Sequence, residues 1–484
     1  MKVTLSSLLS LLLFAGQLPA VTTLDLPDIG DSTGAILSPE FERRLGQSFL
    51  NHVRRHTPIL DDPEVETYIQ SIGYRLVANS DNNERQFTFF VINDSLINAF
   101  AAPGGIVGIN AGVILNSATE SELAAVMAHE VAHVTQKHMA RGAEAQSKMS
   151  VPMMAAMLGA ILIATQNPEA GQAAIVAVQG GAAQAQINFT RGNEEEADRI
   201  GMQLLERSGF NPRGMPGFFE KLQKQSQYSA QAPEFLRSHP LTNNRIADSK
   251  SRAQFFPINK KYDESTSYDF IKSKLIVISH KDPKDAVKYF EYKIQNEEFT
   301  GNIAALSYGH ALAMAAVGEY GKAREQIKAL LKSSPENSSF LLAAADLEMK
   351  AGDYDRAFHY YAVARNLYPD YRPVVLSYSD ALLKAGRPSE AKELLKHYAK
   401  YNPPDLTYYN YLTRAEEESG NSVEAGIANA EYYYLSGETR VAIERLRYIL
   451  QQRDLQPDYY QEERIQARMD LYQQDLEIER VMLK

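Results

Sequence analysis

Two histidines one helical turn apart form the clearest chemical pattern in this sequence. Residues 129–133 read His-Glu-Val-Ala-His. Side chains four residues apart share one face of an α-helix, so the imidazoles of His129 and His133 can reach one cation. Zinc lies about 2.0–2.1 Å from such nitrogens. Glu130 could then take a proton from water as that water attacks a peptide carbonyl. The motif predicts a zinc peptidase, although five residues alone also fit a surface helix that carries two histidines.

A third ligand can come from an acidic segment further along the chain. Residues 190–198 read Thr-Arg-Gly-Asn-Glu-Glu-Glu-Ala-Asp and open a predicted helix. Glu194 and Asp198 are four residues apart, so one can bind the metal while the other hydrogen-bonds a ligand histidine or the reacting group. Glu195 and Glu196 point elsewhere around the helix. We expect them to be solvated or to interact favourably with the helix start.

Two further histidines, His239 and His138, are candidates for positions near this site. His239 precedes Pro240, and Arg245 follows six residues after it. His239 could act as a fourth metal ligand that displaces water, or donate a hydrogen bond to the developing oxyanion. A structural histidine that caps a turn before Pro240 fits the sequence equally well. His138 is nine residues after His129, on the opposite side of an ideal helix, so we expect it at the surface.

The composition argues against several other classes of protein and of metal site. The chain has 484 residues, of which 44% are hydrophobic and 23% charged, so it can build packed cores. At about 150 residues per domain, this length predicts roughly three units. Its 60 acidic side chains outnumber 50 basic ones, which argues against a nucleic-acid binder that neutralises phosphates. Cysteine is absent. Any metal must therefore be bound by histidines and carboxylates.

The N-terminus has the three-part pattern of a secretory signal. Lys2 is followed by an apolar run at 8–15 and by Gln-Leu-Pro-Ala at 17–20. The apolar run is too short for a spanning helix, which needs about 20 residues. We expect cleavage near Ala20 and a mature protein outside the cytoplasm, with an uncleaved anchor as the alternative.

Two predicted helices carry the chemical motifs. Thr119 and Glu122 have the spacing of a capping box, and the helix that they open should run to about Arg141. The acidic segment should lie on a helix that reaches Ser208 and stops at Gly209.

A small sheet should lie beside these helices. Residues 86–92 are rich in aromatic and β-branched side chains, which predicts a buried strand. A second extended stretch at 97–109 should bend at the Pro-Gly-Gly of 103–105. Its first half could be a plain core strand, or an exposed edge that holds a substrate by strand addition.

One long segment carries almost no charge. Between Lys148 and Arg191 the only charged residue is Glu169. Residues 149–190 could line a groove or touch a membrane. Their glutamines would be costly in lipid, which favours a pair of ordinary buried helices.

The C-terminal half repeats with a period of 34 residues. The period is held by three residue types, namely Gly318, Gly352, Gly386 and Gly420, the alanine five positions after each glycine, and Pro335, Pro369 and Pro403. This spacing is typical of a tetratricopeptide repeat. The expected fold is therefore α+β, with a mainly helical metallopeptidase domain and a small sheet at 21–258 after a signal peptide at 1–20. An all-α tetratricopeptide-repeat solenoid should follow at 259–484, and its concave face could bind peptides or partners.

The two motifs together resemble the HtpX-like and CAAX-prenyl-protease-like zinc metallopeptidases. The resemblance rests on His-Glu-Val-Ala-His and on the Arg-x-x-Glu-x-x-Ala-Asp segment about sixty residues later. It implies one zinc ion per chain, bound by His129, His133 and Glu194. It also implies that Glu130 activates water and that Asp198 donates a proton or supports the site. His239 matches the His-Pro segment of the family. Thr190 stands where the family usually has serine, which leaves the ligands unaffected.

The order of export signal, peptidase domain and repeats is similar to that of periplasmic members of this family. The resemblance implies a zinc-dependent endopeptidase with chaperone-like activity that degrades misassembled outer-membrane β-barrel proteins and assists their assembly. The implied partners are unfolded or stalled outer-membrane proteins and the barrel-assembly machinery, with no nucleic acid and at most peripheral membrane contact. The alternative is a non-proteolytic chaperone or assembly scaffold that acts through the repeats, with a closed or structural metal site.

Overall fold

The computed structural model describes residues 39–81, 86–145, 183–228, 233–257, 265–295, 301–452 and 454–482, with isolated positions between 159 and 173 and at 260 and 262. The predicted cleavage near Ala20 and most of the weakly charged segment lie outside the described residues. Within the described part of the chain, none of the helices combines the length and the hydropathy needed to cross a bilayer.

A three-stranded sheet forms the centre of the N-terminal unit. Its strands are β1 (Thr88–Ile92), β2 (Ala99–Ala102) and β3 (Ile106–Asn110), in the order β1-β3-β2. β1 runs parallel to β3, whereas β2 runs antiparallel to it. The short helical turn η1 (Pro103–Gly105) separates β2 from β3, which confirms the predicted bend. β2 is at the edge of the sheet order, yet most of its residues are buried.

Helices pack around this sheet. They are α2 (Pro39–His56), α3 (Pro63–Ala78), α4 (Ala111–Asn116), α5 (Glu120–Thr135), α6 (His138–Ala145), α9 (Ala183–Arg207), α10 (Gly214–Tyr228), α11 (Phe235–Ser238) and α12 (Asn243–Phe255). α5 is central, because it contacts β2, α3, α9 and α10, and nearly all of its residues are buried. A helix with this much burial is held by packing on all sides, so its polar side chains are fixed in place.

The start of α5 follows the sequence prediction, but its end does not. The Thr119 hydroxyl accepts a hydrogen bond from the Glu122 backbone N–H at 3.2 Å. The helix ends at Thr135, so the prediction that it continues to about Arg141 was wrong. Lys137 adopts a positive φ of 54°, which breaks the helix because left-handed backbone cannot continue a right-handed coil. α6 then starts at His138.

The C-terminal half forms an array of antiparallel helices. They are α13 (Thr266–Ser279), α14 (Pro283–Gln295), α15 (Ile303–Ala316), α16 (Tyr320–Ser333), α17 (Ser338–Ala351), α18 (Tyr354–Leu367), α19 (Arg372–Lys384), α20 (Pro388–Tyr398), α21 (Leu406–Glu418), α22 (Ser422–Leu435), α23 (Thr439–Gln451) and α24 (Tyr459–Met482). The four periodic glycines all have φ between 70° and 83° and lie between two helices. Only glycine adopts this conformation readily, so the predicted turns are confirmed.

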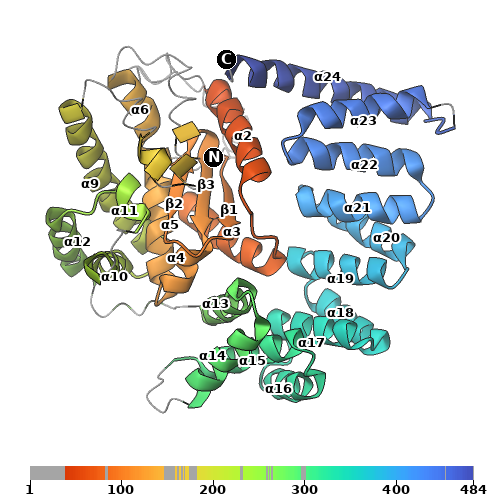
Figure 1. Ribbon diagram of the computed structural model, residues 1–484, viewed down its shortest axis with the longest axis horizontal. Coiled ribbons are helices and arrows are strands. Elements are labelled where there is room, and N and C mark those ends of the chain that lie inside the picture. Colours follow the sequence, from red (N-terminus) through yellow and green to blue (C-terminus); the bar gives the residue numbers. More distant parts are fainter. Residues whose placement is uncertain are drawn as a thin grey trace, which may run out of the picture.

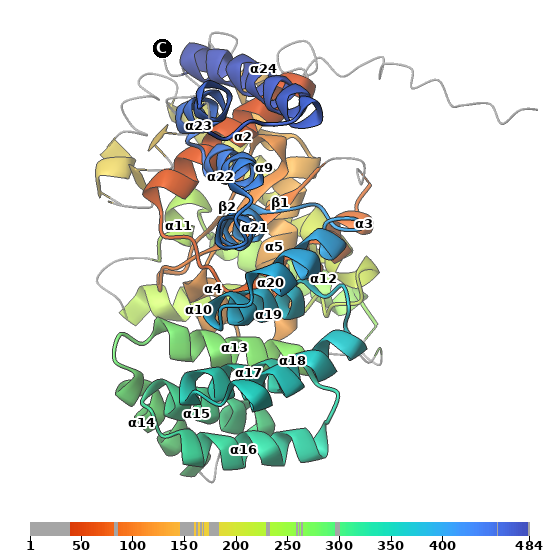
Figure 2. The same ribbon diagram turned by 90° about the vertical axis from the view of Figure 1, so that its right-hand side faces the viewer.

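The repeat array curves around one side of the N-terminal unit. In Figure 1 it runs from α13 at the bottom to α24 at the top, and Figure 2 shows the stacked helices from the side of the array. α13 and α19 contact α3, and α24 contacts α2. α13 joins two cores, because Tyr268, Ile271 and Leu275 pack into the N-terminal core whereas Phe270 packs with Tyr308 of the repeats.

Candidate metal centre

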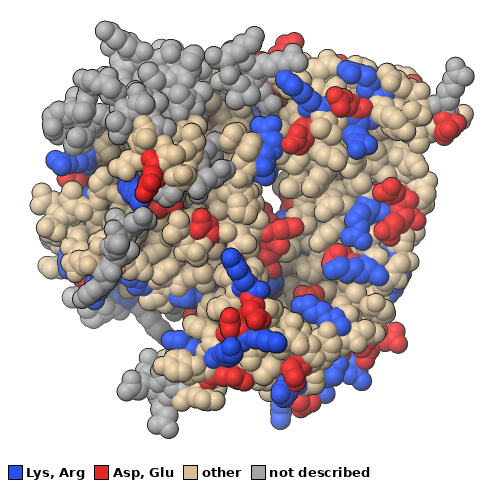
Figure 3. Space-filling model, in the orientation of Figure 1, with Lys and Arg blue, Asp and Glu red and all other residues tan. Residues whose placement is uncertain are grey.

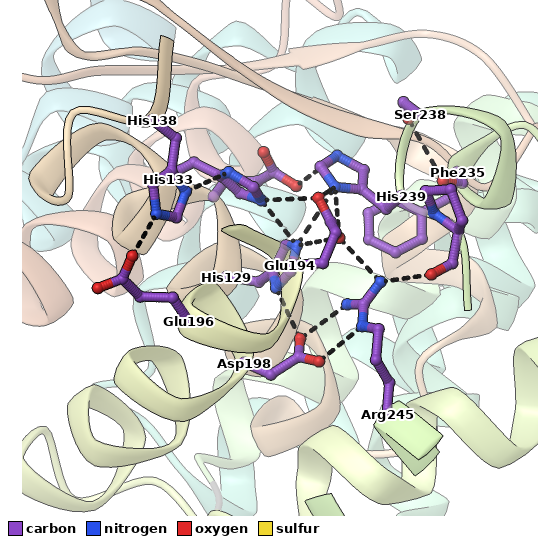
Figure 4. A network of polar contacts seen from close by, with 12 residues as sticks. His129, His133, His138, Glu194, Glu196, Asp198, Phe235, Ser238, His239 and Arg245 are labelled. Carbon is purple, nitrogen blue, oxygen red and sulfur yellow. Dashed lines mark hydrogen bonds and ion pairs between the residues drawn. The ribbon is translucent and has the colours of Figure 1, made fainter. Parts of the chain in front are cut away.

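Three elements bring the predicted site residues together. α5 supplies His129, Glu130 and His133, and α9 supplies Glu194 and Asp198. Figure 4 shows His129 and His133 pointing toward Glu194 and Asp198 of the other helix, with His239 approaching from the end of α11. All six residues singled out in the sequence therefore meet at one place. The end of α9 also follows the prediction, since the helix stops before Gly209, which has a φ of 77°.

The nearest polar atoms have the arrangement of a metal-binding group. His129 Nε2 lies 3.0 Å from His133 Nε2 and 3.3 Å from a carboxylate oxygen of Glu194. The other oxygen of Glu194 lies 3.4 Å from His133 Nε2. One ligand atom from each of His129, His133, Glu194 and His239 lies within 4.8 Å of the others. Imidazole nitrogens with one carboxylate are donors that zinc prefers, so the residues fit this metal.

His239 is placed in this group by the short helix before it. Its backbone N–H donates to the Phe235 carbonyl at 2.9 Å, and its ring stacks on the Phe235 ring with centroids 4.7 Å apart. Its Nδ1 then lies 3.1 Å from Glu194 Oε1 and 3.3 Å from His129 Nε2. His239 is 8% exposed, so it is part of the buried cluster.

Asp198 and Arg245 contact the side chains of this donor group. Asp198 Oδ1 lies 3.0 Å from His129 Nδ1, whereas Nε2 of the same ring faces His133 and Glu194. Arg245 donates to both oxygens of Asp198 at 2.7 and 2.8 Å and lies 2.8 Å from Glu194. Arg245 is only 3% exposed. A fork of guanidinium donors in this position fixes two carboxylates at once.

Glu130 differs from the other carboxylates of the site. Its side chain is fully buried, and within the described part of the chain neither oxygen has a hydrogen-bond partner. One oxygen lies 3.4 Å from His239 Nε2. Burial raises the pKa of Glu130, although the nearby imidazoles oppose this effect. An unsatisfied buried carboxylate is costly for folding, which points to a chemical role.

The charges around the ligands favour a cation. Burial would lower the pKa of His129, but the carboxylates of Asp198 and Glu194 outweigh it and raise that pKa to about 10. Burial lowers the pKa of His133 to about 3. Burial would also raise the pKa of Glu194, but His239 and its neighbours hold it well below the usual value. With no ion bound, Glu194 is thus ionised and His133 neutral at neutral pH, whereas His129 carries a proton that a bound metal would replace.

Two residues expected at the surface lie next to the site instead. His138 is only 5% exposed, and its Nδ1 lies 2.9 Å from His133 Nδ1. The prediction was wrong because it assumed an unbroken helix beyond Thr135. Glu196, expected to be solvated, lies 3.2 Å from His138 Nε2. Glu195 is exposed, as expected.

Comparison with known proteins agrees with this geometry. Residues 63–253 match the family described as Peptidase family M48, and residues 308–372 and 348–415 match tetratricopeptide repeats. The mitochondrial metalloendopeptidase OMA1 of Schizosaccharomyces pombe is 27% identical over 43% of this chain and 60% of its own length.

Two bacterial relatives match nearly the whole chain. The beta-barrel assembly-enhancing protease of Escherichia coli K12 is 37% identical over 87% of this chain and 86% of its own length. The putative beta-barrel assembly-enhancing protease of Vibrio cholerae is 36% identical over 90% and 91%, respectively. The chain therefore belongs to the family of the beta-barrel assembly-enhancing proteases, metalloendopeptidases of family M48 that also carry tetratricopeptide repeats.

Proposed function

We propose that this chain is a periplasmic zinc endopeptidase that degrades misassembled outer-membrane β-barrel proteins and assists the assembly of productive ones. The observation that carries the proposal is the convergence of His129, His133 and Glu194 beside the buried carboxylate of Glu130. The proposed division of the chain is a signal peptide at 1–20, the peptidase domain at 21–258 and the repeat domain at 259–484.

In this proposal His129, His133 and Glu194 hold one zinc ion. Zinc bound there would polarise the scissile carbonyl and the attacking water. Asp198 keeps the ring of His129 oriented through Nδ1, so that Nε2 points to the metal. Arg245 holds Asp198 and Glu194 in turn.

Glu130 is proposed to transfer the proton during cleavage. Its carboxylate takes a proton from water as the water oxygen bonds to the peptide carbon, and then gives that proton to the leaving nitrogen as the C–N bond breaks. Burial raises the pKa of Glu130, which makes it a stronger base than an exposed glutamate.

We propose two roles for His239, one with its ring inside the donor group and one with its ring outside it. Its Nδ1 lies within the donor group, where it would occupy the position that water or substrate needs. If its ring moved out of the group, His239 could donate a hydrogen bond to the developing oxyanion, and in this sense we propose it as a catalytic residue.

The substrates and partners are inferred from the repeats and from the relatives. Repeat arrays present extended concave surfaces that bind peptides and proteins, and both bacterial relatives are named for β-barrel assembly. We infer that the array binds unfolded or stalled outer-membrane proteins and the barrel-assembly machinery of the outer membrane.

The test uses Glu130→Gln in the mature chain with a denatured outer-membrane β-barrel protein as substrate. We expect the variant to retain one zinc per chain and to cleave on the order of 100-fold more slowly or worse, because it lacks the proton-transfer group. Glu195→Gln is the matched control, because it alters the exposed carboxylate next to Glu194 on α9. This variant should cleave normally. Full cleavage by Glu130→Gln would remove Glu130 from this role.

One observation favours a second candidate function. Because His239 completes a group of four donors, the metal site could be closed, and the chain would then act as a chaperone or assembly scaffold through its repeats. Under this alternative, cells that carry only Glu130→Gln should assemble outer-membrane proteins as well as the wild type. Loss of assembly in the same cells would favour the protease.

A further inference from the structure

We propose that His138 and Glu196 are positioning residues for the metal ligand His133. The three side chains form a relay that fixes which nitrogen of His133 carries the proton and how the ring is turned. This inference rests on the proposed function, because it takes His133 as a zinc ligand.

The contacts of the relay are short and mostly buried. His138 Nδ1 lies 2.9 Å from His133 Nδ1, on the edge of the ring that faces away from the donor group. His138 Nε2 lies 3.2 Å from Glu196 Oε2, and Arg141 donates to the same oxygen at 2.8 Å. The His138 side chain is 4% exposed and that of Glu196 is 26% exposed. Figure 4 shows His138 between His133 and Glu196.

The protons of the relay can be assigned from elementary chemistry. His133 Nε2 faces the other ligand atoms, so it must be free of a proton when it binds a metal. The proton of neutral His133 is then on Nδ1, which donates to His138 Nδ1. His138 must carry its own proton on Nε2, and that N–H donates to the Glu196 carboxylate. Only this placement of the two protons gives every donor and acceptor of the relay a hydrogen-bond partner.

The backbone between the two helices makes the relay possible. α5 ends at Thr135, and Lys137 has a φ of 54°. This left-handed residue turns His138 back toward His133 rather than letting it follow the helix to the far side. α6 then places Arg141 one turn after Lys137, with its N–H donating to the Lys137 carbonyl at 2.9 Å, within reach of Glu196.

Both ligand histidines of α5 are then held in the same chemical manner. His129 Nδ1 faces Asp198 directly, whereas His133 Nδ1 reaches Glu196 through the ring of His138. A carboxylate behind a ligand histidine fixes its tautomer and raises its basicity, and loss of such a partner typically weakens metal binding about 10- to 100-fold.

The experiment measures zinc affinity by competition with a chromogenic chelator on the mature full chain. His138→Ala should weaken zinc binding about 10- to 100-fold, and Glu196→Gln should weaken it by about 10-fold. His138→Asn should restore part of the loss, since its amide oxygen can accept from His133 but cannot reach Glu196. Glu195→Gln is the matched control, because this neighbouring carboxylate is exposed, and its zinc affinity should be that of the wild type.

The controls separate this inference from the proposed function. His133→Ala should lose zinc more severely than any relay variant. If His133→Ala loses zinc while His138→Ala and Glu196→Gln bind it within about twofold of the wild type, the relay is wrong and the zinc site stands. If the wild type itself binds no zinc, both fail.

Because His138 is buried, the melting temperature of each metal-free variant is measured too. A loss of melting temperature without a loss of zinc affinity would make His138 merely structural and would overturn the proposal.

Discussion

Single residues of the candidate metal centre differ in how firmly they are held. His129, Glu194 and Asp198 each have a close polar contact from another helix. Among the carboxylates of the site, Glu130 is the exception, because its buried oxygens have no hydrogen-bond partner among the described residues. Buried polar groups in native proteins are normally satisfied, and the exceptions gather at functional sites. This contrast is the reason to give Glu130 the chemical role and the other carboxylates the supporting ones.

Glu234 is a second buried carboxylate without a hydrogen-bond partner among the described residues. Burial and then the charge of Asp94 raise its pKa to about 7, against the weaker effect of Arg237. An unfolded glutamate titrates near 4.5. The folded state therefore retains a proton that the unfolded state has lost between these values, and stability falls as the pH rises from about 4.5 to about 7.

Glu234→Gln should remove this pH dependence. We expect the variant to raise the free energy of unfolding by about 1–2 kcal/mol at pH 8 and to give no gain at pH 4.5, where wild-type Glu234 is protonated in the folded state. Urea unfolding at both pH values measures the difference. Glu195→Gln, at an exposed position, should change neither value. An equal gain at both pH values would contradict the assignment of the shift to Glu234.

At the scale of elements, the turn between α5 and α6 decides where His138 lies. Lys137 has a φ of 54°, a conformation that costs a residue with a side chain about 1–2 kcal/mol and a β-branched residue more. Glycine does not have this cost, although its unfolded chain has more entropy. Lys137→Gly should therefore keep or slightly raise the free energy of unfolding and leave zinc affinity near that of the wild type. Lys137→Val should lower the free energy of unfolding by about 1–2 kcal/mol and weaken zinc binding, because the turn no longer directs His138 to His133.

Chemical denaturation of the metal-free chain, together with chelator competition, measures both effects of the Lys137 variants. Equal values for the glycine and valine variants would show that the turn does not depend on this backbone conformation.

The same turn explains which parts of the site could be predicted from sequence. His129 and His133 follow the period of a helix, and so do Glu194 and Asp198, so their shared faces could be worked out directly. The position of His138 depends on a left-handed lysine, and no residue pattern indicates that a lysine will adopt this conformation. Arg245 could be noted by its spacing from the His-Pro segment, but its contacts depend on how α12 packs against α9.

At the scale of the whole molecule, charged pairs join the repeat array to the N-terminal unit. Lys274 of α13 lies 2.8 Å from Asp62 and 2.6 Å from Glu64 at the start of α3. Arg372 of α19 lies 2.7 Å from Glu66. On the face of the molecule seen in Figure 3, acidic and basic side chains are mixed. The joining pairs are more enclosed than an exposed pair, since Lys274 and Arg372 are 18% and 10% exposed whereas Lys322, paired with Glu319, is 66% exposed.

Lys274→Met should loosen this contact. Burial opposes its charge, but Asp62 and Glu64 outweigh burial and raise the pKa of Lys274 well above its usual value. Lys274 is 18% exposed, and both carboxylates keep other hydrogen-bond donors. Loss of its charge should therefore cost about 1–3 kcal/mol. Lys322→Met, in an exposed pair with Glu319, should change stability by at most about 0.5 kcal/mol.

Urea unfolding measures the stabilities of the Lys274 and Lys322 variants, and small-angle X-ray scattering measures whether the array moves outward. An unchanged stability and radius of gyration for Lys274→Met would show that this contact does not hold the array.

The repeats themselves were predictable, whereas their attachment was not. A period of 34 residues is visible in the sequence, because each repeat packs mainly on its neighbours. The pair between Glu66 and Arg372 joins residues 306 positions apart, and such a contact leaves no periodic trace. For the same reason, the sequence could not indicate that α13 would pack into the N-terminal core as well as the repeats.

The most direct test of the account is anomalous diffraction at the zinc edge from crystals of the mature chain grown with zinc. The account predicts one anomalous peak per chain, about 2.0–2.2 Å from a nitrogen of His129, a nitrogen of His133 and a carboxylate oxygen of Glu194. A peak found only elsewhere, or a Glu194 side chain turned away from both rings, would contradict the claim that these residues form a catalytic metal site.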